Sequence, residues 1–434
     1  MKTPSKKINL FYSTIFIMIS FNYFSCKNLG NKFASFGDEE AIATITSDNE
    51  NELAEAISIL NNSGGTIYID TPVINIEKTV ITLTGEFPGG IIGKRQSSGE
   101  YPRINFSKTN AADGGIVIFG DNKFLEYIIV EGSFVFGINV FGNNNGFDHV
   151  ISRYNSYSGF IVSGDFNTFD YCYSYRNCDT EVSVVNSDGF KISSEINTVF
   201  NYCFAWDNGN SGFNYVRELN STDLSYLHSG SWNNGNVNIF TGRYDFDQGK
   251  PLDRNLRHIQ KIIESDPGFV TNYYNRIYNI NNAKIDDYSV TQWSVLVGPK
   301  MDGDGFTFGN NNSSQSIEVQ RNSFYNVVFD QKTGGFVDHY IHRYNAYITD
   351  CVSFNNGINY KLPYYRLSKW SNNWSWNANN KDQLNGDVKA KIPANTDRAY
   401  KNFYSVRDVI IQSMDANTFP DKINFDKAII SLVE

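Results

Sequence analysis

Short segments of alternating hydrophobic and polar residues recur along the chain, and each begins with a glycine. The glycine is followed by a hydrophobe, one exposed position and, in most copies, a second hydrophobe, in "GINV" (Gly137), "GFIV" (Gly159), "GFKI" (Gly189), "GFNY" (Gly212), "GFTF" (Gly305) and "GFVD" (Gly335). The regular steps are roughly 22 to 30 residues, which is the length of one turn of a solenoid. The pattern predicts at least five stacked coils of short strands between residues 137 and 360.

A second repeat lies between these segments and places an aromatic residue before an asparagine, in "SRYNS" (152–156), "SYRN" (174–177), "AWDN" (205–208), "SWNN" (231–234) and "SFNN" (353–356). We expect this Asn at the bend in the left-handed conformation, which Asn tolerates better than most residues. Cys172, Cys203 and Cys351 each stand three residues before the aromatic. They are therefore predicted to form one inward, unpaired ladder rather than disulfides or a metal site.

These signals predict an all-β fold, a single-stranded right-handed parallel β-helix. The helical signals are "NELAEAISILNNSGG" (51–65), expected as a capping helix over 51–62, and 251–268 within an insertion at about 244–301. We expect the insertion to be a partly helical lid or wall beside a groove. The predicted organisation is a signal peptide over 1–25, a linker over 26–45 and one β-helix domain over 46–434, with a C-terminal cap at about 400–434.

The N-terminus is typical of bacterial export. Three lysines precede an apolar run from Ile8 to Ser20, and "FNYFSC" ends at Cys26, which indicates a signal peptide closing at a lipidated cysteine. The alternative is an uncleaved membrane anchor, because Tyr23 and Phe24 are unusual before such a cysteine. We expect a monomer that is secreted or lipid-anchored to an outer membrane, with no other membrane contact.

Composition and net charge limit the classes of partner that we expect. The chain has 434 residues, of which 41% are hydrophobic and 19% charged, and its formal net charge is −9. This charge excludes nucleic acid as the expected partner, and it also opposes binding of a polyanion unless cations are concentrated locally.

Four segments, "NSDGFKI" (186–192), "NTVFNYCFAWDNGNSGFNYV" (197–216), "GDGFTFGNN" (303–311) and "SFNNGINYKL" (353–362), resemble the family 9 polysaccharide lyases, which are β-helical pectate and rhamnogalacturonan lyases. The tail "DANTFPDKINF" (415–425) is similar to that family's C-terminal signature. The resemblance implies an acidic, pectin-type or rhamnogalacturonan-type polysaccharide as partner and cleavage by β-elimination. In that reaction a lysine removes the C5 proton of a uronic acid while calcium neutralises the carboxylate.

The resemblance also implies where the family's site residues fall. Its calcium aspartates fall on Asp188, Asn210, Ser211 and Asn214, and its lysine base falls on Thr307. Only Asp188 keeps the acid, so we expect a weak calcium site or none, and no other cofactor. A threonine hydroxyl cannot act as a base without an activating partner.

The repeat register suggests a replacement. Lys191, Asn214 and Thr307 hold the same outward position of successive repeats, so we expect one external column with Lys191 one coil from Asn214 and two from Thr307. Lys191 is then an ammonium standing in for calcium or a base that has moved. The alternative is a solvated lysine paired with Asp188.

Further candidates follow Thr307. His339, His342 and Arg343 lie on the next predicted coil, and a histidine base with an arginine carboxylate clamp would suit a lyase without calcium. The alternative places both histidines on the surface of a turn. Three functions stay open: an acidic-polysaccharide lyase, a non-catalytic glycan-binding solenoid, and a β-helical glycoside hydrolase, for which "NSDGF" is the superficial similarity.

Overall fold

The computed structural model describes residues 41–78, 80–106, 115–133, 135–155, 157–177, 187–193, 197–208, 210–215, 223–227, 229–232, 234, 305–308, 316–319, 326–329, 334–338, 345–349, 351–363 and 366–420. All of them belong to one compact unit, Glu40–Glu434. The predicted insertion at 244–301, Cys26, Cys178, His339, His342 and Arg343 lie outside the described residues.

Ten strands form one parallel sheet, which we call sheet B, and each coil contributes one strand to it. Neighbouring strands pair in chain order. The strands are β4 (Ile81–Leu83), β7 (Ile116–Ile118), β9 (Ile138–Val140), β11 (Phe160–Val162), β14 (Phe190–Ile192), β17 (Phe213–Tyr215), β20 (Phe306–Phe308), β23 (Gly334–Asp338), β26 (Ile358–Leu362) and β29 (Gln383–Leu384).

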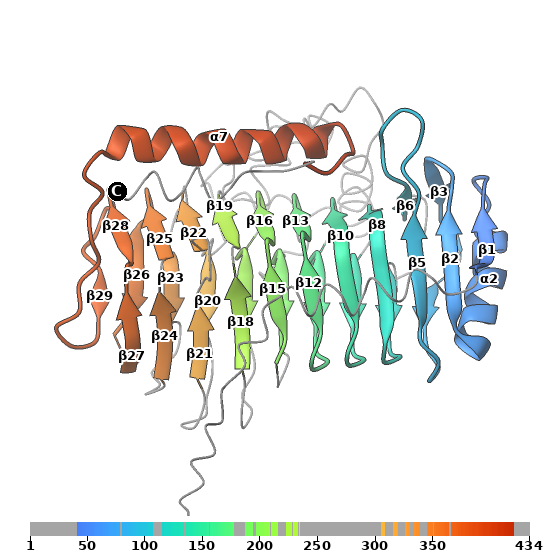
Figure 1. Ribbon diagram of the computed structural model, residues 1–434, viewed down its shortest axis with the longest axis horizontal. Coiled ribbons are helices and arrows are strands. Elements are labelled where there is room, and N and C mark those ends of the chain that lie inside the picture. The colour runs from blue at the N-terminus through green and yellow to red at the C-terminus, as the bar shows by residue number, and fades with distance from the viewer. Residues whose placement is uncertain are drawn as a thin grey trace, which may run out of the picture. The chain divides into compact units, whose positions relative to one another are not determined.

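The other nineteen strands form sheet A, which runs along the coils in two rows (Figure 1). The first row contains β1 (Ala41–Ile45), β2 (Gly65–Ile69), β5 (Gly89–Gly93), β8 (Lys123–Glu131), β10 (Gly146–Arg153), β12 (Thr168–Asp170), β15 (Val199–Asn201), β18 (Asp223–Leu227), β21 (Ser316–Val319), β24 (Asn345–Thr349) and β27 (Arg366–Ser371). The second row contains the later parts of β8 and β10 together with β3 (Val73–Asn75), β6 (Arg103–Asn105), β13 (Tyr173–Tyr175), β16 (Phe204–Trp206), β19 (Gly230–Trp232), β22 (Asn326–Phe329), β25 (Cys351–Phe354) and β28 (Trp374–Trp376). Three strand positions per coil, all parallel, make a parallel β-helix, which confirms the predicted fold.

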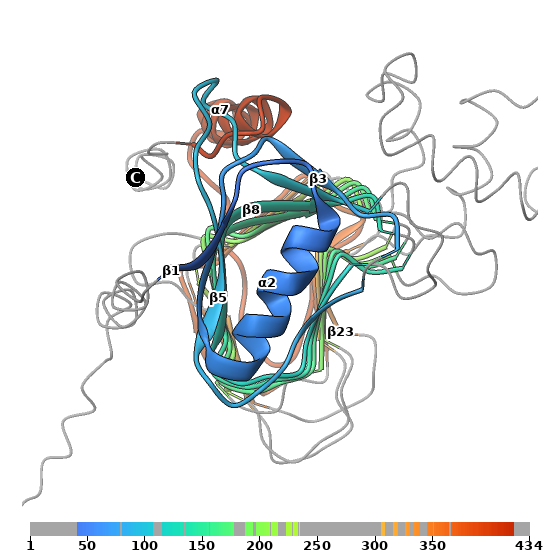
Figure 2. The same cartoon turned by 90° about the vertical axis from the view of Figure 1, so that its right-hand side faces the viewer.

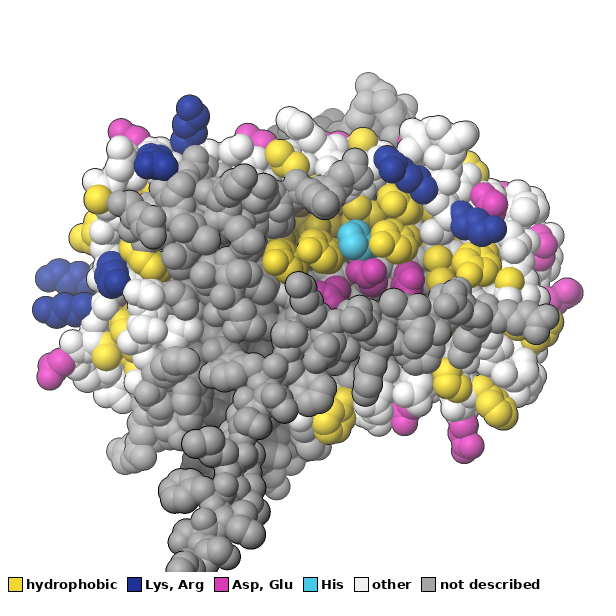
Figure 3. Space-filling model, in the orientation of Figure 1, with side chains coloured by type: hydrophobic (Ala, Val, Ile, Leu, Met, Phe, Trp, Pro, Cys, Tyr) yellow, Lys and Arg dark blue, Asp and Glu magenta, His cyan; other side chains and the backbone are white. Residues whose placement is uncertain are grey.

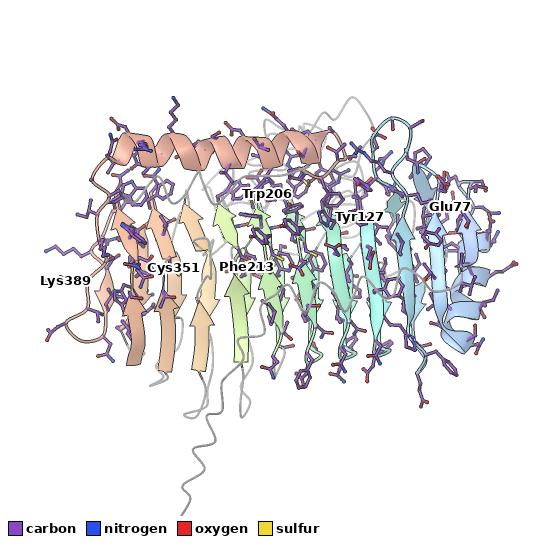
Figure 4. The ribbon with its side chains drawn as sticks, in the orientation of Figure 1. Glu77, Tyr127, Trp206, Phe213, Cys351 and Lys389 are labelled. Atoms are coloured by element: carbon purple, nitrogen blue, oxygen red, sulfur yellow. The ribbon has the colours of Figure 1, made fainter. Side chains whose placement is uncertain are left out.

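The core consists of columns of like residues on successive coils. Phe160, Phe190 and Phe213 are fully buried and stack on one another, with ring centroids 4.7 and 4.8 Å apart. Cys172 and Cys203 are fully buried, form no disulfide and lie one coil apart, and Cys351 lies buried and outside any disulfide farther along (Figure 4). The prediction of inward cysteines without disulfides is therefore confirmed.

Three of the recurring asparagines have a different role from the one predicted. The left-handed conformation belongs to the residue before each of them, with φ of 56° at Tyr154, 55° at Arg176 and 54° at Asp207. Asn155 and Asn177 are instead buried in a ladder, in which the backbone N–H and side-chain Nδ2 of Asn155 both donate to Oδ1 of Asn177 at 3.1 and 2.9 Å. The prediction is confirmed at Asn355 of "SFNN", with φ of 58°. It was wrong for Asn155, Asn177 and Asn208, because a buried amide satisfies the turn's backbone groups and the residue before it takes the strained conformation.

The N-terminal end is capped by α2 (Glu50–Ser63), as predicted, and α2 lies across the first coils in the view along the coils (Figure 2). The side chain of Asn49 accepts hydrogen bonds from the first-turn backbone, and Leu53 and Leu60 are buried against the core. β1 pairs with β2, so the solenoid begins at Ala41, and the predicted linker over 26–45 is five residues too long.

A second helix, α7 (Thr396–Asp415), was missed by the sequence analysis. It runs beside the second row of sheet A rather than capping the last coil (Figure 1): Tyr400 packs on Phe354 of β25, and Met414 O accepts from Arg153 of β10 at 3.2 Å. The helix covers an outer row of large aromatic side chains, Tyr175, Trp206, Trp232, Phe354 and Trp376, of which Trp206 is labelled in Figure 4. Among the described residues, no helix is long and apolar enough to span a membrane.

Candidate functional site

The predicted external column exists on sheet B. Lys191 pairs with Asn214, and Asn214 pairs with Thr307, each one coil apart, so Lys191 lies two coils from Thr307. The flanking Phe190 and Ile192 are fully buried while Lys191 is partly exposed, as the alternation of a strand requires. We call this outward row, which continues through Ile161 and Asn139 toward the N-terminal coils, the lysine column.

Asp188 lies just before β14 and is fully buried. Its Oδ1 accepts hydrogen bonds from Nδ2 of Asn210 at 2.9 Å and from the backbone N–H of Ser211 at 3.1 Å, and its Oδ2 accepts from Nδ2 of Asn214 at 3.0 Å. The structure therefore brings together the four residues that the resemblance assigns to the calcium positions. Two amide side chains and one backbone N–H donate to the one carboxylate among them.

Burial governs the electrostatics of this carboxyl. Removal from water raises the pKa of Asp188 to about 6, and the charge of Lys191 and the three hydrogen bonds oppose that rise. Donors on both oxygens stabilise the carboxylate form without a metal ion.

Lys191 belongs to β14 of sheet B, and its ammonium lies 5.5 Å from the centre of the Tyr157 ring. Its charge also acts on Asp188. The lysine is thus held between an aromatic face and a buried carboxylate, with its side chain partly exposed. A cation in that place can attract an anionic group of a ligand lying along the column.

The donor set around Asp188 does not fit calcium. Calcium takes six to eight oxygen ligands with carboxylates among them. Here one carboxylate is surrounded by groups that point N–H bonds at it, and within the described ranges no three His, Cys, Asp or Glu side chains are grouped so as to hold a metal. We therefore derive no step through calcium.

Sequence reasoning missed a second column, on the first row of sheet A. Glu126, Asp148 and Asp170 pair in register on consecutive coils, followed by Asn201, and we call these four residues the acidic column. An aromatic residue follows each of them, and Tyr127, His149, Tyr171 and Tyr202 stack with centroids 4.7 to 4.8 Å apart. The signal is present in the sequence as "EY", "DH", "DY" and "NY", at the spacing of the coils.

The acidic column is only partly neutralised. Nδ1 of His149 lies 2.7 Å from Asp148, and Nδ2 of Asn201 donates to Asp170 at 2.5 Å. Burial, with repulsion from Asp148, raises the pKa of Glu126 to about 7, and burial raises that of Asp170 to about 6. Figure 3 shows the cyan of a histidine among yellow side chains, directly beside magenta acidic ones.

Successive coils of three parallel strands place the chain in the class of right-handed parallel β-helix proteins, and its candidate site lies on the outer surface of one sheet. Residues 33–247 match the family model described as the Pel9A-like right-handed beta-helix region. Over these residues, just under half of the chain, the sequence is similar to that family, which confirms the resemblance to the family 9 polysaccharide lyases.

A solved structure supports the same fold. Pectate lyase Pel9A superposes with a TM-score of 0.58 at 18% sequence identity, over 89% of this chain and 90% of that chain. A rhamnogalacturonan lyase has a TM-score of 0.48 at 12% identity, over 89% of this chain and 96% of that chain. No curated protein matched the sequence.

Proposed function

We propose that this chain is a polysaccharide lyase that cleaves an acidic, uronic-acid-containing polysaccharide of the pectin type by β-elimination, and that it does so without calcium. The observation that carries the proposal is the position of Lys191. It lies one coil from Asn214 and two coils from Thr307, on the outward column that holds the positions equivalent to the family's calcium ligand and base.

The chemistry requires a positive charge at that position. The proton on C5 of a uronic acid becomes acidic enough to remove only when the neighbouring carboxylate is neutralised. The Lys191 ammonium pairs with that carboxylate. A base takes the C5 proton, the electron pair forms the C4–C5 double bond, and the C4–O bond breaks. The departing oxygen takes a proton from solvent water and becomes a hydroxyl on the released chain.

The residue that takes the C5 proton is a prediction from the sequence alone. The Thr307 backbone lies in the column, but a threonine lacks a group that titrates near neutral pH. His339 and His342 are the predicted proton acceptors, and Arg343 is a predicted second clamp on the carboxylate.

A second candidate is a glycan-binding protein without catalysis. It is supported by the hydrogen-bonded state of Asp188, whose oxygens are occupied by the side chains of Asn210 and Asn214 and by a backbone N–H, and by the threonine at the base position. Such a protein would keep Lys191 as an anion-binding group.

One experiment distinguishes a lyase from a hydrolase and from a glycan-binding protein. Purified protein is incubated with pectate, rhamnogalacturonan and alginate, with and without a chelator, and the ultraviolet absorbance of unsaturated uronate is followed. We expect absorbance to rise on at least one polymer at the same rate in both conditions. Reducing ends without absorbance would indicate a hydrolase, and retardation in an affinity gel without either product would indicate the binding protein.

We further propose export with a lipid anchor at Cys26, from the basic start, the apolar run and the terminal cysteine of the leader. Cys26→Ser should move the protein from the membrane fraction to the soluble fraction of an expressing bacterium. An unchanged membrane fraction would support the uncleaved anchor instead.

A further inference from the structure

Exposed phenylalanines gather on one bend of the solenoid, where the chain leaves sheet B. Four consecutive coils have one there: Phe87 is 53% exposed, Phe119 55%, Phe141 45% and Phe166 46%. Half of the large exposed hydrophobic side chains among the described residues are in this one series. Two of these rings, Phe119 and Phe141, stack on each other, and such a paired apolar surface marks a place where a ligand binds more often than a single exposed ring does.

Phe119 and Phe141 stand at the same position of adjacent coils and are stacked, with centroids 4.9 Å apart and planes at 11°. The next two coils have Ser163 and Ser193 at that position, as the ladder bonds from their N–H groups to Val140 O (2.8 Å) and Val162 O (2.7 Å) show. The stack of rings therefore ends at Phe141. One face of its ring is covered by Phe119, and the other is directed along the coils over Ser163.

The two serines form a polar floor beside that face. Their Oγ atoms are 2.9 Å apart, and both side chains are partly exposed. A flat apolar face next to paired hydroxyls matches a sugar ring, which has a C–H face and hydroxyls at its edge.

This shelf adjoins the lysine column. Ser193 follows Lys191 by two residues at the end of β14, and residues two apart in an extended chain point to the same side. Coils are separated by roughly 4.8 Å, so a ring stacked on Phe141 would lie above Ser163, about one coil from Lys191 along the solenoid. Ser163 is also two residues further along the chain than Ile161, which pairs with Lys191, an offset of roughly 6.6 Å. Neighbouring sugar residues of one extended chain can span this combined separation.

We infer that Phe141, Ser163 and Ser193 form a binding subsite for a sugar residue next to the uronate held by Lys191, so that the glycan extends from Lys191 toward the N-terminal coils. This inference rests on the proposed function for the identity of the glycan. The continuity of the shelf with the Lys191 charge selects one occupant, an acidic polysaccharide chain. Phe141 is then a specificity-determining residue.

The test uses the full chain in affinity gels containing pectate, rhamnogalacturonan or alginate. Phe141→Ala should weaken retardation by about fivefold to tenfold, because one stacking contact is lost. Phe141→Leu, which keeps bulk without a flat ring, should weaken it similarly, whereas Phe141→Tyr should bind like the wild type. Phe87→Ala is the matched control, a similarly exposed ring two coils farther from Lys191, and it should change binding less than twofold. Thermal unfolding confirms that each variant is folded.

Each outcome decides a different point. If Phe141→Ala and Phe87→Ala behave alike, the subsite is wrong, whether or not the protein cleaves its glycan. If binding depends on Phe141 but no unsaturated uronate forms, the subsite stands and the lyase function fails. If the wild type is retarded by none of the three polymers, both are overturned.

Discussion

The lysine column and the acidic column share the register of the β-helix but differ in how their charged side chains are arranged. Successive coils place equivalent side chains in direct register, so like charges in one register repel. On sheet B a single carboxylate, Asp188, accepts bonds from three donors and lies near the charge of Lys191. On sheet A the carboxylates of Glu126, Asp148 and Asp170 follow one another.

The difference shows what each column is able to do. Amide donors keep Asp188 hydrogen-bonded and leave Lys191 as the cation on its surface, which suits an anionic ligand. In the acidic column, burial and the neighbouring acid raise the pKa of Glu126 to about 7, so this group is only partly charged at neutral pH. The lysine column therefore presents a positive charge, whereas the acidic column loses part of its negative charge.

The largest expected effect is on stability when Asp188 is removed. Asp188→Ala leaves the buried donors of Asn210 and Ser211 and the partly buried donor of Asn214 without their acceptor, and we expect the free energy of unfolding to fall by about 2–4 kcal/mol. Asp148→Ala is the matched control, since that side chain is 37% exposed and should cost under about 1 kcal/mol. Urea denaturation measures both. Equal losses would break the distinction between the two columns.

A smaller effect of opposite sign is expected in the acidic column. The folded-state pKa of Glu126 is raised, so the folded protein holds its proton more tightly than the unfolded chain, and stability falls as pH rises from about 4.5 to about 7. Glu126→Gln removes that penalty. We expect a gain of about 1–2 kcal/mol at pH 8, after allowing for the partial exposure of the group, and none at pH 4. A pH-independent change in urea denaturation would contradict the assigned cause.

The smallest expected signal is calcium binding. With one carboxylate among Asp188, Asn210, Ser211 and Asn214, we expect a Kd weaker than about 0.1 mM by calorimetry. Sub-micromolar affinity that Asp188→Ala abolishes would show that the amides turn their oxygens to a metal, and the lysine column would then resemble the family's calcium site.

Much of the fold could be predicted because its pattern is local and repeated. The alternation in "GFKI", "GFNY" and "GFTF" was enough to place Lys191, Asn214 and Thr307 in one column, since strands have a period of two. The same repeats placed the cysteines inside.

Other features depend on contacts that a linear pattern does not contain. The helix α7 is stabilised by an outer row of aromatic side chains from distant coils, including Trp206 and Phe354, so its own periodicity gave little signal. The donors around Asp188 depend on which way the Asn210 and Asn214 amides point. The acidic column is visible in its spaced dipeptides only once the register of the coils is known.

The central claim is that activity depends on the cation of the lysine column, and one comparison tests it most directly. Lys191→Met and Lys361→Met each remove one lysine from the same outward row, but Lys361 lies two coils beyond Thr307. On the polymer that the wild type cleaves, we expect kcat/KM, followed by the absorbance of unsaturated uronate, to fall on the order of a hundredfold or more for Lys191→Met. Lys361→Met should stay within about twofold of the wild type, because a distant surface charge is largely screened. Full activity of Lys191→Met, or equal losses in the two variants, would contradict the account.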